Sequence, residues 1–281
     1  MHEREAREDE LTVDATAFSG PVPAFYDRFL GPTLFGPYAA AVASRLAARH
    51  PGGDVLEVAC GTGLCTDELR RRLPPTVGLV ATDLNEAMLG YAQGKPDAPT
   101  SVDWRTADAC ALPFPSGRFG SLLCQFGLMF VPDKAAALRE AHRVLRPDGV
   151  CVVSVWDSPE VNRFAKVADD FLLARVGAAS GGFFQVPFGY HDRGAIARLF
   201  DDAGFDATLE TVPLEARSDS AEALATGFVM GTPLRIALEE GGIPLGPIVG
   251  DLTTALAALG GARPFTCPMQ ALVVEAVKRH A

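Results

Sequence analysis

The chain has 281 residues, of which 48% are hydrophobic, and a formal net charge of −10 from 35 acidic residues against 25 lysines and arginines. This much apolar sequence is enough for a large core. The acidity argues against nucleic acid and anionic membrane surfaces as partners, because both attract basic patches. No apolar stretch reaches the roughly eighteen residues that a membrane-spanning helix needs, and we expect a cytoplasmic protein.

The six cysteines form no C-x-x-C pair, and no cluster of histidine and cysteine has the spacing of a metal site. Most of the cysteines lie in apolar, strand-like stretches. We therefore interpret them as small buried residues in a reducing compartment, and we expect no bound metal ion.

The first fifty residues divide into a tail and a helical segment. Residues 1–20 begin with a charged run and are expected to form a mobile tail. Residues 21–50 carry apolar side chains at helical spacing, and Gly31-Pro32 is expected to interrupt the helix. The core follows at residues 51–157.

Residues 55–66 predict a buried strand, a glycine turn and the start of a helix, as in a nucleotide-binding unit. Gly61 and Gly63 would let the backbone approach a ligand closely. Glu57, at the end of the strand, would repel a pyrophosphate but suits a ligand with an ammonium or sulfonium group. The alternative for Glu57 is a bracing or capping role.

A second apolar run ends in Asp83, twenty residues after Gly63. At this place an α/β nucleotide-binding protein positions the carboxylate that receives the ribose hydroxyls. Asn85 is the expected N-cap of the helix that follows.

Five motifs in this region resemble those of class I S-adenosylmethionine-dependent methyltransferases and follow one another in the same order. They lie at residues 57–63, 82–89, 107–114, 126–133 and 143–149. The set is similar to the ubiquinone/menaquinone-biosynthesis type (methyltransferase type 11) of small-molecule methyltransferase. Ala59 stands where the family has the first glycine of its first motif.

The resemblance implies an α/β, Rossmann-like, doubly wound seven-stranded sheet with the last strand antiparallel. It also implies an N-terminal helical lid at residues 21–50 and a helical insertion between the last two strands. Residues 158–281, where the match fades, would supply the substrate-side helices and closing strands of the same domain. The implied cofactor is S-adenosyl-L-methionine, and the product is S-adenosyl-L-homocysteine.

The same resemblance implies a set of cofactor contacts. Tyr26 would reach the methionine end of the ligand or simply pack in the lid. Asp108 and the Ala109 amide would read the edge of adenine, unless Asp108 is only an N-cap. Met88 would pack near the adenine or be ordinary core, and Gln125 and Phe126 are expected at the cofactor-substrate boundary because they lie at the carboxyl end of a strand. The full set of expected contacts is Tyr26, Glu57, Ala59, Cys60, Gly61, Gly63, Asp83, Leu84, Met88, Asp108, Ala109, Gln125 and Phe126.

Beyond the motifs, helices are predicted at residues 161–176 and 192–203, with a flexible aromatic loop between them at residues 181–190. Strands are predicted at residues 205–216 and 269–277. The segment between these strands, punctuated by Gly-Pro turns, predicts the helical insertion.

A sulfonium methyl group is already a strong electrophile, so the protein needs chiefly to align a nucleophile and exclude water. A hydroxyl acceptor benefits from a general base. His191 is the candidate base, with capping or bracing of the next helix as its alternative, and Asp157 is a weaker candidate. Aromatic and apolar residues favour an apolar acceptor, although core packing would explain them equally: Phe183, Phe184, Phe188, Tyr190, Phe228 and Met230.

We therefore predict a methyltransferase, monomeric or homodimeric, that acts on an O, N or C atom of a small, apolar or aromatic molecule. Two alternatives stay open. A protein that uses the same cofactor for cyclisation or rearrangement, without methyl transfer, would share every motif. A nicotinamide-dependent oxidoreductase is disfavoured by Glu57 and by Thr66, which stands in place of a third glycine.

Overall fold

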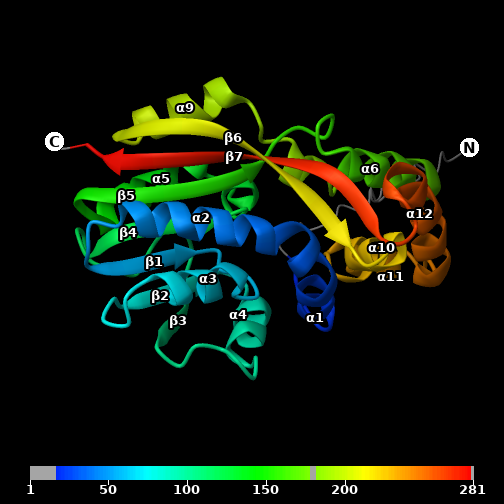
Figure 1. The fold of residues 1–281 in the computed structure, drawn as a ribbon, viewed down its shortest axis with the longest axis horizontal. Helices are drawn as coiled ribbons and strands as arrows, with labels where there is room; N and C mark the ends of the chain where they lie inside the picture. The colour runs from blue at the N-terminus through cyan, green and yellow to red at the C-terminus, as the bar shows by residue number, and fades with distance from the viewer. Residues whose placement is uncertain (1–16, 178–181, 280–281) are drawn as a thin grey trace, which may run out of the picture.

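The computed structural model describes residues 17–177 and 182–279, so most of the expected tail lies outside the described residues. A seven-stranded sheet with the order β3-β2-β1-β4-β5-β7-β6 forms its centre (Figure 1). The strands are β1 (Asp54–Val58), β2 (Leu79–Asp83), β3 (Val102–Thr106), β4 (Phe119–Gln125), β5 (Leu145–Trp156), β6 (Phe205–Ser218) and β7 (Phe265–Lys278).

Strands β1 to β5 pair in parallel, whereas β7 is antiparallel to both β5 and β6. This confirms the predicted doubly wound, Rossmann-like sheet with its antiparallel last strand. The strand order reverses between β1 and β4, and open α/β sheets bind ligands at such a point, beyond the carboxyl ends of the strands.

Helices cover both faces of the sheet, as the alternation of strand side chains shows. Val55 and Leu123 pack with α2 (Gly36–Arg49) and α3 (Leu64–Arg72), while their neighbours Leu56 and Leu122 belong to the cluster that includes α5 (Lys134–Val144). Successive side chains of a strand point to opposite faces, so both faces of these strands are buried.

The N-terminal lid is one continuous helical segment, so the predicted interruption at Gly31-Pro32 is wrong. α1 (Val22–Phe25) runs into η1 (Tyr26–Phe35), which is a π-helix, and then into α2. The Gly36 N–H donates to the Gly31 carbonyl, five residues back. In an α-helix the Pro32 ring would clash with the carbonyl four residues back, and the wider π-helical turn relieves this clash.

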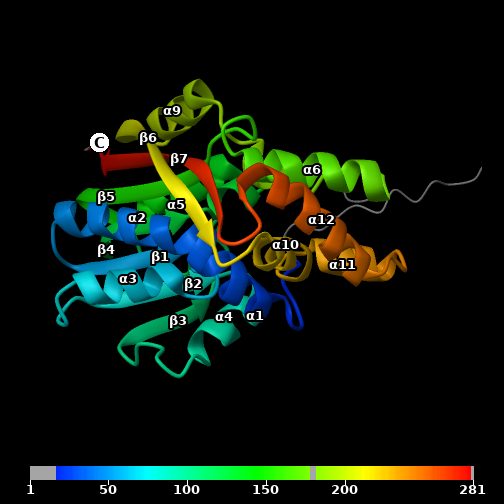
Figure 2. The ribbon, with the colours of Figure 1, turned by 45° about the vertical axis from the view of Figure 1, so that its right-hand side comes forward.

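The insertion between β6 and β7 is helical, as predicted. It contains α10 (Ala221–Met230), α11 (Leu234–Glu240) and α12 (Leu245–Gly260). α10 packs on η1, and α12 packs on α6 (Arg163–Val176). Figure 2 shows these helices grouped beyond one end of the sheet, where they can enclose a ligand.

The prediction of a flexible aromatic loop at residues 181–190 needs correction for its described residues. Within the expected aromatic loop, the described residues include α8 (Gln185–Phe188), and Phe183, Phe184 and Phe188 are buried, since their rings pack into the core. α5 ends at Val144, and β5 begins at the next residue. The remaining helices are α4 (Glu86–Gln93), the 3-10 turn η2 (Leu128–Phe130) and α9 (Arg193–Asp202).

The six cysteines are all free, and Cys110 alone among them is half-buried rather than buried. Within the described part of the chain, no helix has the length and apolar character needed to cross a membrane.

Candidate functional site

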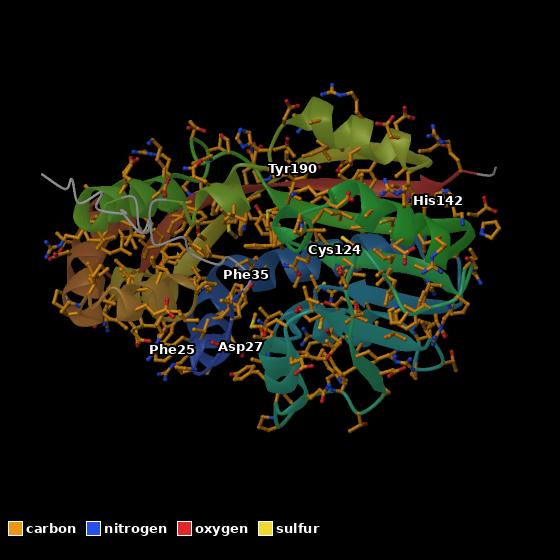
Figure 3. All side chains as sticks on the ribbon, turned by 180° about the vertical axis from the view of Figure 1, so that it is seen from behind. Phe25, Asp27, Phe35, Cys124, His142 and Tyr190 are labelled. Carbon is orange, nitrogen blue, oxygen red and sulfur yellow. The ribbon has the colours of Figure 1, made fainter. Side chains whose placement is uncertain are left out.

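A cavity of about 530 Å³ lies beyond the carboxyl ends of the parallel strands. Its wall includes the last residues of β1, β2, β4 and β5, which are Val58, Asp83, Gln125 and Trp156. η1, which belongs to the N-terminal lid, covers the cavity, and Figure 3 shows Phe35 of η1 lying over the strand ends. The cavity therefore occupies the place that the reversal of strand order predicts.

One part of the cavity, here called the polar half, is formed by the segments that follow β2 and β3. It is lined by Asp83, Leu84, Asn85, Met88, Ala107, Asp108 and Ala109. The Asp83 carboxylate accepts hydrogen bonds from the Gly61 N–H at 2.7 Å and the Asn85 N–H at 2.8 Å. These bonds fix its orientation, and each oxygen keeps capacity for a further donor. Burial raises the pKa of Asp83.

The other residues of the polar half are held by local capping interactions. The Asn85 side chain accepts hydrogen bonds from the Ala87 and Met88 amides, which confirms it as the N-cap of α4. Asp108 accepts a hydrogen bond from the Cys110 N–H at 2.8 Å. Asp108 thus combines a local turn-stabilising role with a place on the cavity wall.

The glycine turn divides the predicted contacts of the first motif. Ala59 and Gly61 line the cavity, whereas Glu57, Cys60 and Gly63 are not among the described lining residues. Glu57 is 1% exposed and accepts a hydrogen bond from the Thr66 hydroxyl at 2.6 Å. Because neighbouring strand residues point to opposite faces, Val58 reaches the cavity and Glu57 does not. The geometry favours the bracing role for Glu57.

Burial also changes the protonation of Glu57. It raises the pKa of this carboxyl to about 8, although the hydrogen bond from Thr66 opposes the shift. Near pH 7 this shift disfavours the charged form of Glu57. The buried carboxyl is therefore poorly suited to supply the negative charge that the sequence suggested for a cationic ligand.

Ala59, in the position of a family glycine, fits because Gly127 faces it. A Cβ atom built on Gly127 would lie 2.3 Å from the Cβ of Ala59. The close approach of the segments after β1 and β4 thus permits one side chain at this contact, and the chain carries it on residue 59.

The lid contributes a stacked aromatic pair. The rings of Tyr26 and Phe35 lie 4.7 Å apart at an interplanar angle of 17°, and both line the cavity. Gln125 donates a hydrogen bond from Nε2 to the Phe35 carbonyl at 2.8 Å, which ties the end of β4 to the lid. On the other side, Lys95 forms a 2.6 Å ion pair with Asp27 of η1.

The remaining part of the cavity, here called the aromatic half, lies beyond β4 and β5. Phe126 stacks on Trp156 at 4.2 Å, and Trp156 stacks on Phe188 at 5.4 Å. Phe126 has a φ of 53°, a left-handed conformation that costs a non-glycine residue about 1 kcal/mol or more. The aromatic half is lined by Phe126, Met129, Trp156, Phe183, Phe184, Phe188, Phe228 and Thr232.

The structure does not bring the predicted bases into the cavity. Among the described residues, His191 and Asp157 are absent from its lining. His191 Nδ1 lies 2.8 Å from the Phe188 carbonyl, and Asp157 accepts a hydrogen bond from the Gln270 side chain at 2.7 Å. Both side chains are engaged in bracing contacts, but His191 contacts the preceding helix α8, whereas Asp192 caps the next helix, α9.

The sequence did not identify several cavity residues. Phe35, Met129 and Thr232 were not assigned to a site, although Met129 belongs to a motif that the resemblance includes. Tyr190 and Met230 were assigned to the acceptor site, but they are not among the described lining residues. Helical spacing reports which side of a helix is apolar, but not which apolar residues border a cavity.

Comparisons with known proteins agree with this geometry. A family model described as "Methyltransferase domain" matches residues 55–149. The ubiquinone/menaquinone biosynthesis C-methyltransferase UbiE of Shewanella frigidimarina is 32% identical over 196 residues, which cover 65% of this chain and 76% of that protein. The chain belongs to the S-adenosylmethionine-dependent methyltransferase family. The UbiE protein of Geobacter sulfurreducens is 35% identical over 138 residues, 48% of this methyltransferase and 53% of that relative's length.

Solved structures share the fold of this methyltransferase at low sequence identity. Haemonchus contortus phosphoethanolamine N-methyltransferase 2, in complex with S-adenosyl-L-methionine, has a TM-score of 0.58 at 15% identity. The match covers 95% of this chain and 59% of that chain. The [4+2]-cyclase SpnF has a TM-score of 0.52 at 19% identity, with 86% and 81% covered. At such identities the likeness shows the fold alone.

The residues of the cavity fit the cofactor of the family. The polar half offers Asp83 to ribose hydroxyls, apolar Leu84 and Met88 to a base, and Asp108 beside the Ala109 amide as neighbouring acceptor and donor groups. Leu84 is 62% exposed, so its apolar surface has room for a ligand. The residues of the polar half thus fit an adenosine group, and the other end of the cavity is apolar.

Proposed function

We propose that this methyltransferase moves a methyl group from S-adenosylmethionine to an O, N or C atom of a small, neutral, apolar or aromatic molecule held in the aromatic half. One observation carries this proposal. Among the described lining residues, the charged side chains are Asp83 and Asp108, both in the polar half, and none is basic. A charged acceptor would lose its hydration in the aromatic half without a charged partner in return.

The cofactor assignments are part of the proposal. Asp83 would hold the ribose, with Leu84 and Met88 on the base and with Asp108 and Ala109 at its edge. Tyr26, Ala59, Gly61, Gln125 and Phe126 border the passage between the two halves, where the methionine end would lie.

When bound, S-adenosylmethionine supplies an electrophilic methyl group. The chain's own part is to align the acceptor and exclude water. Phe35 and the stacked rings of Phe126 and Trp156 border the space where this alignment would occur. Since the described lining of the aromatic half includes no carboxylate or imidazole, the reacting atom must be nucleophilic as it binds.

The test is to incubate the purified protein with S-adenosylmethionine and matched pairs of acceptors, neutral aromatics and their phosphorylated or carboxylated counterparts. Mass spectrometry would measure S-adenosylhomocysteine and the methylated product. We expect turnover of neutral acceptors and at least tenfold less of the charged counterparts. Turnover confined to charged acceptors would contradict the proposal. Conversion of an acceptor without S-adenosylhomocysteine would instead establish the non-methylating alternative.

A further inference from the structure

Four residues of η1 line the cavity, and one of them lies at an unexpected position in the sequence. Tyr26, Leu30 and Leu34 follow one another at intervals of four residues, which keeps them near one face of any α-helix. Phe35 comes nine residues after Tyr26. At about 100° per residue, nine steps in an α-helix end on the opposite face.

The π-helical winding removes this conflict. Bonding to the fifth residue back widens the helix to about 4.4 residues per turn, so that nine residues make about two full turns. Tyr26 and Phe35 then share a face, and their rings stack at 4.7 Å. The winding, and not the spacing alone, therefore places Phe35 on the cavity wall.

The local sequence supports this winding. Pro32 lies inside η1 and cannot donate a backbone hydrogen bond, while the Gly36 N–H reaches back to Gly31. The Thr33 hydroxyl donates to the Phe29 carbonyl at 2.9 Å, so a side chain serves a carbonyl in the widened turn. π-Helical turns are rare and are found frequently at functional sites.

The positive charge of the sulfonium group points to a role for the stacked Tyr26 and Phe35 rings. The passage between the halves must receive the reactive centre, because adenosine binds at Asp83 and the acceptor binds beyond Phe126. The described acidic residues of the lining, Asp83 and Asp108, belong to the polar half, and Glu57 is buried behind the wall. The passage is bordered instead by aromatic rings, with Phe35 5.7 Å from Phe126 and 6.0 Å from Trp156.

We propose that the π-helical turn builds a cation-recognition wall, in which the Phe35 ring, supported by the stacked Tyr26 ring, binds the sulfonium centre of S-adenosylmethionine. Aromatic faces attract cations through the ring quadrupole. Because S-adenosylhomocysteine is a neutral thioether, the wall favours the substrate form of the cofactor over the spent form. This inference rests on the proposed function, since it concerns the same cavity.

The test measures the preference of one protein for two ligands. Calorimetric titration gives the Kd of S-adenosylmethionine and of S-adenosylhomocysteine for the wild type, Phe35→Leu and Phe35→Met; methionine keeps the volume of the side chain. We expect S-adenosylmethionine to bind about 3- to 30-fold more weakly to both variants, as the loss of a cation–π contact implies. The affinity for S-adenosylhomocysteine should change less than twofold. Sinefungin, in which an amine-bearing carbon replaces the sulfonium, should follow S-adenosylmethionine.

Phe29→Leu is the matched control. Phe29 belongs to the same helix and stacks on Phe25 at 6.0 Å, but it is not among the described residues that line the cavity. This variant loses an aromatic contact of the lid and should leave the ratio of the two affinities unchanged.

Equal weakening of both ligands in the Phe35 variants would overturn the inference, because it would reduce Phe35 to a packing role. The inference would also be overturned if Phe29→Leu lowered the ratio of the two affinities as much as the Phe35 variants do. Failure of either ligand to bind the wild type would contradict the proposed function itself, and the inference with it.

Discussion

The polar half of the cavity comes from residues that directly follow neighbouring strands, whereas the aromatic half collects side chains from segments as distant as Phe126 and Phe228. In the polar half, short turns and caps fix each group, as the amides of Gly61 and Asn85 do for Asp83. In the aromatic half, rings hold one another in place across the fold. The first region can thus be specified by local sequence, and the second depends on tertiary packing.

The largest effect should come from Asp83→Ala. Loss of a buried carboxylate that receives ligand hydroxyls should weaken S-adenosylmethionine binding about 100-fold, because hydrogen bonds to charged groups contribute about 1.5–3 kcal/mol each. Calorimetric titration measures this change. Asp103→Ala, on the neighbouring strand β3 and paired with Arg105 at the surface, is the control and should bind normally. Equal loss in both variants would mean that the polar half does not hold the ligand.

The stability of the protein should depend on the protonation of Glu57. Its pKa is raised to about 8 in the folded protein, so the folded state holds a proton that the unfolded state releases above about pH 4.5. The contribution of Glu57 to stability is then fully present below about pH 4.5 and is lost as the pH rises through about 8. Within this window each pH unit contributes about 1.4 kcal/mol, or about 2 kcal/mol between pH 5.5 and 7.

Glu57→Gln separates this effect from other titrating groups. Denaturant unfolding across the same pH range should give a flatter profile for this variant, since the amide keeps a hydrogen-bond acceptor for Thr66 and does not titrate. Parallel profiles for the two proteins would show that Glu57 is charged in the folded protein. Glu57 could then attract a cationic ligand.

The contact between Ala59 and Gly127 offers a compensation test at the passage between the halves. Gly127→Ala should lower the free energy of unfolding by about 1–3 kcal/mol, as overpacking does, because its Cβ would lie 2.3 Å from that of Ala59. Adding Ala59→Gly removes the clash with residue 59, leaves a 3.0 Å approach to the Cys124 sulfur, and should recover most of the loss in a denaturant titration. An unchanged deficit in the double variant would show that the two methyl groups do not compete.

The smallest effect should arise in the aromatic half. Phe184→Leu should raise the KM of a neutral aromatic acceptor about tenfold, since an aromatic contact contributes about 0.5–1.5 kcal/mol. The Kd of S-adenosylmethionine should stay within twofold. A change in cofactor affinity as large as the change in KM would break the distinction between the halves.

The sequence predicted what is locally encoded. The sheet with its antiparallel last strand, the helical lid and the helical insertion are confirmed, and Asp83, Asp108 and Ala109 lie on the cavity wall. Strand periodicity and strand-end residues carry this information, because each depends on neighbours along the chain.

The errors concern features that depend on three-dimensional context. Gly31-Pro32 suggested a break, but packing of the lid on α3 and α10 retains the helix as a π-helix. Phe183 and Phe184 suggested a flexible loop, but their rings are buried in the aromatic half. The α-helical spacing also gave no reason to place Phe35 beside Tyr26. In each case tertiary contacts selected a conformation that the local pattern did not favour.

The most direct test of the central claim is transfer of an isotope label from the methyl group of S-adenosylmethionine to a neutral aromatic acceptor. We predict that the label enters the acceptor in a one-to-one ratio with S-adenosylhomocysteine, and that Asp83→Ala lowers this transfer at a fixed cofactor concentration. Methyl transfer to a neutral acceptor would be contradicted if the label stayed on S-adenosylmethionine while the acceptor was converted, or if only charged acceptors received it.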